Sequence, residues 1–198
     1  MITHIYVAKL KPDATDAQVA AWLEAIQGLE IGGMSELRCG VDLGLRDGND
    51  DVAITADFED AEAWRRYDQD ELHNQIRAQH AKPIVESQQR CQFTRHFRFE
   101  TLCDIRNVTL ITFKADAPEG HAGHVAERLQ GLKVPGLAHL DAGPDLGLAP
   151  GNASAGVICD FEGAEGYLAY DRDALHNRIR QEDVLPYVES ARRVQFEI

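Results

Sequence analysis

The sequence lacks the features of membrane-spanning, secreted and zinc-binding proteins. No apolar run approaches the roughly 18 residues that a bilayer-spanning helix needs, and the start of the chain lacks the basic and apolar regions of a signal peptide. The four cysteines include no Cys-x-x-Cys pair, which argues against a zinc ribbon or a redox motif and fits reduced thiols. We therefore expect a soluble, cytoplasmic protein.

Basic residues are scarce. The chain of 198 residues has 20 Lys and Arg against 33 Asp and Glu, a formal net charge of −13 at pH 7. Such a charge repels phosphate backbones and anionic lipid heads, so we expect neither nucleic-acid binding nor membrane-surface binding. The hydrophobic share of 44% and the charged share of 27% are typical of a globular protein, and the length fits one large domain or two small ones.

The chain repeats itself at a constant offset of 103 residues. The segment Leu72-His73-Asn74, for example, recurs as Leu175-His176-Asn177, and roughly four positions in ten are identical across the two halves without a gap. A repeat of this length indicates a duplicated domain rather than a short solenoid unit. We expect a tandem pair.

Each repeat alternates between the period of a strand and the period of a helix. The expected elements of the first repeat are a strand at 3–10, a helix capped by Thr15, strands at 34–41 and 52–58 around a turn at Gly48-Asn49, a second helical region from Asp60 that bends near Asp70 and ends toward Pro83, and a strand through Cys91, Phe93, Phe97 and Phe99. The second repeat follows the same pattern.

This order is β-α-β-β-α-β, the ferredoxin-like arrangement of the α+β class. A four-stranded sheet with helices on one face leaves its other face bare, and two units in one chain can cover these faces by packing sheet to sheet. We expect such an enclosed barrel, with the His4 and Asn107 side of the first strands facing its interior. The predicted divisions are residues 1–99 for the first repeat, 100–106 for a linker and 107–198 for the second repeat.

A set of spaced residues occurs in both repeats. In the first, these are His4 and Lys11, an Asp-Phe-Glu strand end, Tyr67 six residues before His73, Pro83, and Arg90-x-x-Phe93. In the second, the matching residues are Asn107, Lys114, Tyr170, His176, Pro186, Arg193 and Phe196. This pattern resembles the stress-responsive A/B barrel domain family, also called the Dabb or dimeric α/β-barrel family. Because its single-domain members form homodimers whose sheets enclose a barrel, the resemblance implies an intramolecular dimeric α/β-barrel.

The resemblance also implies a site and a chemistry. In a plant polyketide cyclase of this family, a Tyr and a His promote an aldol-type ring closure without a metal or an organic cofactor. The motif places them at Tyr67 and His73, and the first-strand His of that enzyme at His4. The second-repeat counterparts are Tyr170, His176 and Asn107. Two other pocket positions depart from that enzyme, which has a tyrosine at the place of Ile26 and Leu129 and a histidine at the place of Val52 and Ala155.

Tyr67 and His73 suit proton transfer. An imidazole titrates near neutral pH and a phenol can donate to a developing oxyanion, so the pair fits enolisation or aldol-type chemistry, with His4 orienting a carbonyl or relaying a proton. The alternative is a pair that stabilises the helical bend through bonds to the backbone, because it occurs in both repeats. Since Asn107 cannot titrate where His4 can, we expect any active pocket in the first repeat.

Two classes of function remain open. One is a cofactor-independent enzyme or binder, whose partner is a small, partly apolar carbonyl compound, and the other is a non-catalytic stress-response or interaction protein. A cofactor-free monooxygenase of a related barrel superfamily shares the fold but has no separate signature here. The chain itself is expected to be a monomeric pseudo-dimer or a homodimer.

Other conspicuous residues are expected to be structural or solvated. His121 and His124 have helical spacing but no complete ligand set, so we expect them on a helix surface. The remaining expectations are His80, His96 and His139 as surface or locally bonded residues, Asp47, Asp50 and Asp51 as a solvated turn, and Trp22 and Trp64 as core residues. The Gly40-x-Asp42-x-Gly44 segment is not followed by the helix start and lysine of a nucleotide loop.

Overall fold

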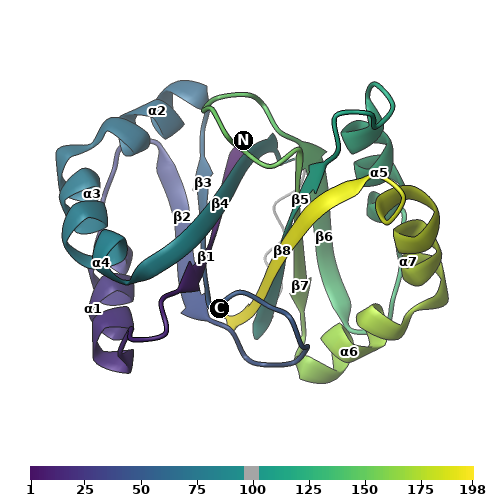
Figure 1. Ribbon diagram of the computed structural model, residues 1–198, viewed down its shortest axis with the longest axis horizontal. Helices are drawn as coiled ribbons and strands as arrows, with labels where there is room; N and C mark the ends of the chain where they lie inside the picture. The colour runs from purple at the N-terminus through teal and green to yellow at the C-terminus, as the bar shows by residue number, and fades with distance from the viewer. Residues whose placement is uncertain (96–102) are drawn as a thin grey trace.

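The computed structural model describes residues 1–95 and 103–198, which form two successive β-α-β-β-α-β units (Figure 1). The first unit consists of β1 (Ile2–Leu10), α1 (Asp16–Gln27), β2 (Met34–Val41), β3 (Val52–Phe58), α2 (Ala61–Gln69), α3 (Glu71–Ile76), the π-helical turn η1 (Arg77–Ala81), α4 (Lys82–Ile84) and β4 (Val85–Thr94). The second consists of β5 (Ile105–Phe113), α5 (His121–Gln130), β6 (Leu137–Pro144), β7 (Ala155–Phe161), α6 (Ala164–Arg172), α7 (Ala174–Ile179), the π-helical turn η2 (Arg180–Val184) and β8 (Val188–Glu197). The predicted order of elements is confirmed.

Local sequence explains where the first helix begins. The Thr15 hydroxyl accepts the backbone N–H of Gln18 at 3.3 Å, and the Gln18 side chain accepts the backbone N–H of Thr15 at 2.9 Å, which together form a capping box. Within the described ranges, every helix is too short or too polar to cross a membrane. The predicted strand residues Phe97 and Phe99, together with His96, lie outside the described residues.

Each unit contains one four-stranded antiparallel sheet. The strand orders are β2-β3-β1-β4 and β6-β7-β5-β8, so β1 and β5 are central while β4 and β8 are edge strands. On β1, His4 lies opposite Ala56 of β3 and Gln92 of β4. This ferredoxin-like topology agrees with the expected fold class.

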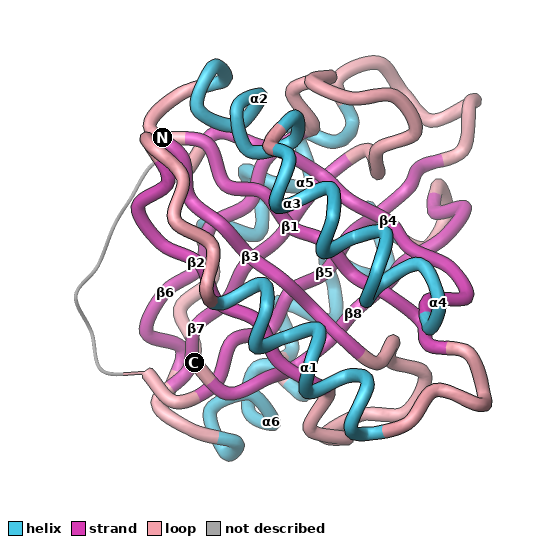
Figure 2. The backbone as a smooth tube through the Cα atoms, turned by 90° about the vertical axis from the view of Figure 1, so that its left-hand side faces the viewer, coloured by secondary structure: helices cyan, strands magenta, loops and turns pink. Residues whose placement is uncertain are grey.

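The two sheets face each other, and the helices cover their outer faces (Figures 1 and 2). One apolar cluster lies between each sheet and its own helices, with Trp22 and Trp64 as buried members in the first unit. A third cluster joins residues of both sheets, and Phe93 and Phe196 are fully buried there. The prediction that the units pack sheet to sheet is confirmed.

The orientation predicted for the first strands is wrong. The side chains of Ile5 and Val7 point into the interface between the sheets, so the alternate residues, which include His4, lie on the face that the helices cover. The physical reason is that Ile5 and Val7 bring aliphatic side chains to the interface, while the polar Thr3 and Lys9 on the same side of β1 bond to Asp57 and Asp51. The other side, with its polar groups, faces a cavity beneath the helices.

The loops between the second and third strands of each unit cross over to the other unit (Figure 1). In loop 145–154, the backbone N–H of Leu146 donates to the carbonyl of Gln92 at 2.8 Å, and that of Ala153 donates to the carbonyl of Arg90 at 2.9 Å. The Gln92 N–H in turn donates to the Asp145 carboxylate at 2.9 Å. These bonds satisfy the outer backbone groups of the edge strand β4.

Loop 42–51 makes the matching contacts on β8. The backbone N–H of Leu43 donates to the Gln195 carbonyl at 2.8 Å, and Arg192 forms a two-pronged ion pair with Asp50 at 2.7 and 2.9 Å. Asp51 pairs with Lys9 at 2.9 Å. The expectation of a solvated turn is therefore wrong for these two aspartates, because both lie in ion pairs.

The repeated Asp-Phe-Glu strand ends hold buried ion pairs. Asp57 accepts bonds from the Arg95 guanidinium at 2.6 Å and from the Thr3 hydroxyl at 2.6 Å. Asp160 binds Arg106 through both carboxylate oxygens, at 2.7 and 2.9 Å. A buried charge needs such a partner, and removing one member would leave the other unpaired.

The sheets approach each other closely at glycines. A Cβ added at Gly40 on β2 would lie 2.8 Å from the Cβ of Phe196 on β8, and one added at Gly143 on β6 would lie 3.0 Å from the Cβ of Phe93 on β4. These positions need glycine because the ring of the facing strand occupies the space of a side chain.

Replacement of Gly40 by Ala should lower the free energy of unfolding by roughly 1–3 kcal/mol, the usual cost of overpacking a core. Gly123→Ala on α5 is the control, because a Cβ there meets nothing within 4 Å and alanine favours a helix over glycine by up to about 1 kcal/mol. Urea unfolding measures both variants. A Gly40→Ala protein as stable as the native chain would contradict the sheet-to-sheet contact.

Candidate functional site

Tyr67 and His73 lie on either side of the bend between α2 and α3. Asp70 caps α3, since its carboxylate accepts the backbone N–H of His73 at 2.8 Å. The His73 Nδ1 lies 2.9 Å from the carbonyl oxygen of Tyr67, and the two rings stack with centroids 4.0 Å apart. His176 and Tyr170 repeat both distances. The pair thus stabilises the helical bend in both units. The bond to the tyrosine carbonyl uses the Nδ1 of each histidine and not its Nε2.

The backbone bond fixes which nitrogen of His73 carries the proton. A carbonyl oxygen only accepts hydrogen bonds, so Nδ1 must be the donor and Nε2 keeps an unprotonated lone pair. Burial lowers the pKa of His73, against the opposing effect of its bond to the Tyr67 backbone. The ring is therefore neutral near pH 7, with Nε2 able to accept a proton.

His4 lies on β1 beneath the same helices and is buried. Its ring centroid is 5.8 Å from that of Tyr67 and 6.4 Å from that of Trp64. Burial, followed by the positive charge of Arg90, lowers the pKa of His4 to about 3. The imidazole therefore remains neutral and acts as a hydrogen-bonding group rather than as a cation.

Hydrogen bonds from the second unit fix the tautomer of His4. The Asp145 carboxylate only accepts, so the Asn152 amide that lies 2.9 Å from it must present its NH₂ group. The same NH₂ group donates to the Gln92 Oε1 at 2.8 Å, which turns the NH₂ group of Gln92 toward the His4 Nδ1, also at 2.8 Å. The Nδ1 of His4 therefore accepts, and its proton lies on Nε2. His4 and His73 hold opposite tautomers.

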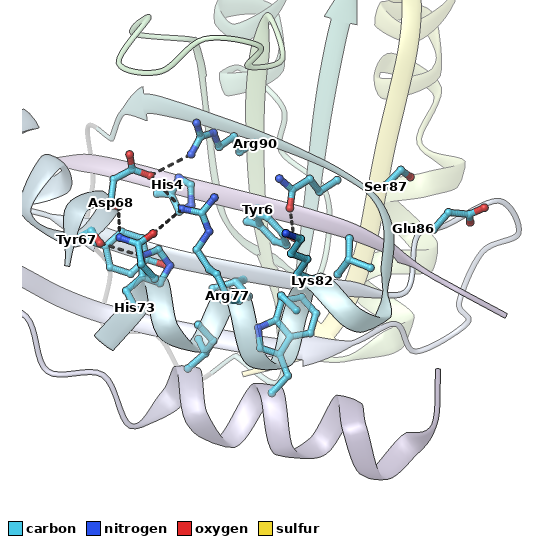
Figure 3. A pocket seen from close by; sticks show the side chains of 18 residues that line it. His4, Tyr6, Tyr67, Asp68, His73, Arg77, Lys82, Glu86, Ser87 and Arg90 are labelled. Carbon is cyan, nitrogen blue, oxygen red and sulfur yellow. Dashed lines mark hydrogen bonds and ion pairs between the residues drawn. The ribbon is translucent and has the colours of Figure 1, made fainter. Parts of the chain in front are cut away.

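A cavity of about 500 Å³ lies between the first sheet and its helices, and His4, Tyr67 and His73 line it together (Figure 3). The structure thus unites the three candidate residues of the first unit. The apolar part of the lining includes Trp22, Ile26 and Ile54, and the charged part consists of Arg77, Lys82, Arg90, Asp68 and Glu86.

The phenol of Tyr67 is a proton donor in this cavity. Burial raises the pKa of its hydroxyl, so it stays protonated at physiological pH. In the second unit, the Cys159 thiol beside the Tyr170 hydroxyl contributes to the raised pKa of that hydroxyl. The position of Cys159 is occupied by Ala56 in the first unit, so the Tyr67 hydroxyl has no thiol neighbour there.

The second unit contains a smaller cavity, of about 120 Å³, whose lining includes Asn107, Tyr170 and His176. Burial lowers the pKa of His176 to about 4. The amide oxygen of Asn107 accepts the NH₂ group of Gln195 at 2.7 Å. Arg46, which reaches across from the first unit and pairs with Asp171, also lines this cavity, whereas the corresponding position beside the first cavity is Ala149.

The expectation for His121 is wrong. Its ring is buried against Phe113 and Tyr187, and its Nε2 lies 2.6 Å from the carbonyl of Asp183. His139 is also buried. The first turn of α5 packs against the end of η2, which its sequence pattern does not reveal. Among the described residues, no group of three or more His, Cys, Asp or Glu side chains could hold a metal ion.

Gln92, Asn152 and Asp145 are residues of the site that the sequence did not identify as such. Each recurs at the 103-residue offset, as Gln195, Asn49 and Asp42. That recurrence was visible, but the loop residues fitted a simple turn. Only the fold shows that each loop crosses to the other unit and meets the glutamine there.

The stress-responsive A/B barrel domain model matches residues 2–100 and again 105–198. Among solved structures, a protein described as anthrone oxidase-like has a TM-score of 0.70 at 12% identity, with 99% of this chain and 90% of that chain covered. A putative monooxygenase from Fusobacterium nucleatum has a TM-score of 0.60 at 14% identity, with 99% and 91% covered. A dimeric ferredoxin-like protein of unknown function from Thermobifida fusca has a TM-score of 0.44 at 25% identity, with 53% and 99% covered. A search of curated proteins finds no match.

Replacement of His4 by Asn, the residue of the second unit at this position, should make stability less sensitive to acid. The pKa of His4 is about 3 in the folded chain and about 6.5 when unfolded, so the unfolded chain binds more protons between these values and the free energy of unfolding falls as the pH is lowered through this range. Between pH 7 and pH 5, the native chain should lose roughly 2 kcal/mol more than His4→Asn. Urea unfolding at both pH values tests this, and equal losses would contradict the burial of a neutral His4.

Replacement of Asn152 by Ala should allow the His4 ring to adopt either tautomer. Without the amide that orients Gln92, its side chain can turn over, and the His4 ring should populate both tautomers. Nitrogen-15 NMR of the imidazoles distinguishes them. Asn49→Ala is the matched control, because Asn49 makes the equivalent bond to Gln195 at 2.6 Å beneath Asn107. A single Nε2–H tautomer in Asn152→Ala, or an equal change in the control, would refute the hydrogen-bond chain.

Proposed function

Because this chain belongs to the stress-responsive A/B barrel domain family, we propose that the cavity of its first unit binds a small carbonyl compound and moves a proton at the carbon next to the carbonyl. The observation that carries the proposal is the pair of opposite tautomers. His73 offers the lone pair of its Nε2 and His4 offers an Nε2–H, and both rings line one cavity. His73 can therefore act as a base and His4 as a hydrogen-bond donor.

The proposed step is an enolisation. The Nε2 of His73 takes the proton from the α-carbon, the electrons of the broken C–H bond move into the C–C–O unit, and a negative charge develops on the oxygen. The Nε2–H of His4 and the hydroxyl of Tyr67 donate hydrogen bonds to that oxygen. The enolate then takes that proton back from His73, or its carbon attacks a second carbonyl in an aldol-type closure and the alkoxide that forms takes the proton from His73. No oxidant, metal or organic cofactor enters this balance.

Two features of the cavity support a partly apolar substrate of this kind. Trp22 and Ile26 give one side of the cavity an apolar surface, which suits a hydrocarbon or aromatic group. Burial holds the pKa of His73 below its ordinary value, so the base stays unprotonated in mildly acidic solution. Activity should therefore persist below pH 6.5 and disappear only when His73 becomes protonated.

A second candidate is a non-catalytic stress-response or interaction protein. The observation that favours it is the equal geometry of the two His–Tyr pairs, which stabilise the same helical bend in both units. The domain division at 1–99 and 107–198 and the cytoplasmic location remain proposals from the sequence.

His73→Ala and His176→Ala separate these candidates. Each removes the same bond to a tyrosine carbonyl, so both should cost similar stability, measured by urea unfolding. The assay is the keto–enol interconversion of benzoylacetone, followed by its ultraviolet absorbance. The proposal expects His73→Ala to slow the catalysed rate at least 100-fold, the usual contribution of a general base, and His176→Ala to retain it. Equal losses, a loss from His176→Ala alone, or no catalysis by the native chain would refute the proposal.

A further inference from the structure

The cavity of the second unit differs in character from that of the first. Its floor consists of Ile111, Leu129 and Val157, which are all buried. Its volume of about 120 Å³ is of the order of an apolar cavity of roughly 150 Å³ that can bind benzene. The cavity as a whole therefore has room for about one small ring or a short branched chain.

Three guanidinium groups surround this floor. Arg46, Arg180 and Arg193 line the cavity with Asp171 as the one carboxylate among its described lining residues. The side chains of Arg46 and Arg180 are 24% and 29% exposed, so they reach both the cavity and the solvent. The lining thus carries two more positive than negative charges, in a chain whose net charge is −13.

Arg193 is the cation of this cavity that lacks an ion-paired carboxylate among the described residues. Its Nε donates to the amide oxygen of Asn49 at 3.1 Å, and no carboxylate of the described residues lies within ion-pair distance of it. Burial and then the neighbouring charge of Arg46 lower the pKa of Arg193. Arg193 is half-buried, and a partly desolvated cation beside other cations is costly unless an anion joins it.

The hydroxyl of Tyr167 is a second polar group of this cavity that lacks an acceptor for its proton within the described ranges. Its side chain is 1% exposed and lines the same cavity. The Arg46 guanidinium lies beside its oxygen, but a guanidinium only donates hydrogen bonds, so the hydroxyl proton has no acceptor among the described residues. Burial raises the pKa of this hydroxyl, so it keeps its proton. A buried hydroxyl usually finds an acceptor, and the cavity is the space from which one can come.

The first unit lacks some of these features. Its residue at the place of Tyr167 is Trp64, and Ala149 stands at the place of Arg46. The Arg90 guanidinium, which corresponds to Arg193, donates to Asp68 at 3.1 Å. Arg180 and Arg193 recur beside the first cavity as Arg77 and Arg90, so what distinguishes the second cavity is Arg46, the Tyr167 hydroxyl and an Arg193 with no ion-paired carboxylate among the described residues.

We propose that the second cavity is a binding site for a small aromatic carboxylate. The ring packs on the aliphatic floor, and the carboxylate lies among Arg193, Arg46 and the Tyr167 hydroxyl. A carboxylate matches the geometry of a guanidinium and can accept a hydrogen bond from the hydroxyl at the same time. This site is separate from the proposed proton transfer in the first unit and does not depend on it.

Benzoate is the probe, and isothermal titration calorimetry with the full chain is the measurement. Benzamide has the same shape without the charge and should bind at least tenfold more weakly. Arg193→Gln should weaken benzoate binding about tenfold or more, whereas Arg90→Gln, the matched change in the first unit, should leave it unchanged. Tyr167→Phe is a second test in case Arg193→Gln destabilises the chain. It removes a single oxygen and should weaken benzoate binding several-fold.

Three results would overturn the proposal: no binding of benzoate at millimolar concentration, equal binding of benzamide, or a loss of binding in Arg90→Gln but not in Arg193→Gln or Tyr167→Phe. The last would place the acid in the first cavity. The benzoylacetone assay depends on His73 in the first cavity, whereas the calorimetry reports on the second cavity. Absence of benzoate binding would therefore not affect the proposed proton transfer, and absence of catalysis would not affect the proposed binding site.

Discussion

The edge strand of each sheet depends on a loop from the other unit. An uncovered edge strand presents unpaired N–H and C=O groups that invite pairing with other chains. Here the outer groups of Arg90 and Gln92 on β4 are bonded to loop 145–154, and β8 receives loop 42–51 in the same way. The polar loop contacts also fix the register of the two sheets, across an interface whose apolar side chains give little directional preference. Neither unit has a complete set of hydrogen bonds without the other.

The same crossing gives the two cavities different chemistry. Leu148 and Ala149 pack against the core of the first unit and Leu45 against that of the second, so each loop shapes the cavity of the unit to which it does not belong. Arg46 brings a positive charge to the smaller second cavity, whereas Ala149 stands at the corresponding position of the other loop. The tautomer of His4 depends on the same crossing, through Asn152 and Gln92.

Much of this architecture was accessible from the sequence, and the limits have physical causes. Periodicity and the repeat gave the strands at 34–41 and 52–58, the helix that Thr15 caps, and the tandem fold. The alternation of β1 separated its two faces but could not say which face lay under the helices, since both are partly apolar. His121 was misplaced because its burial depends on η2, some 60 residues away in sequence. The Gln92–His4 bond joins strands, and the Asn152–Gln92 bond joins units, so neither follows from local pattern.

The covalent link between the repeats has a consequence for how such a protein can diverge. In a symmetric homodimer, a substitution in the crossing loop alters both cavities at once, so any gain in one site is imposed on the other. In this chain, Arg46 and Ala149 are encoded separately, and a single mutation reaches a single cavity. Separate coding of the two loops thus allows the lining of one cavity to change while that of the other stays the same.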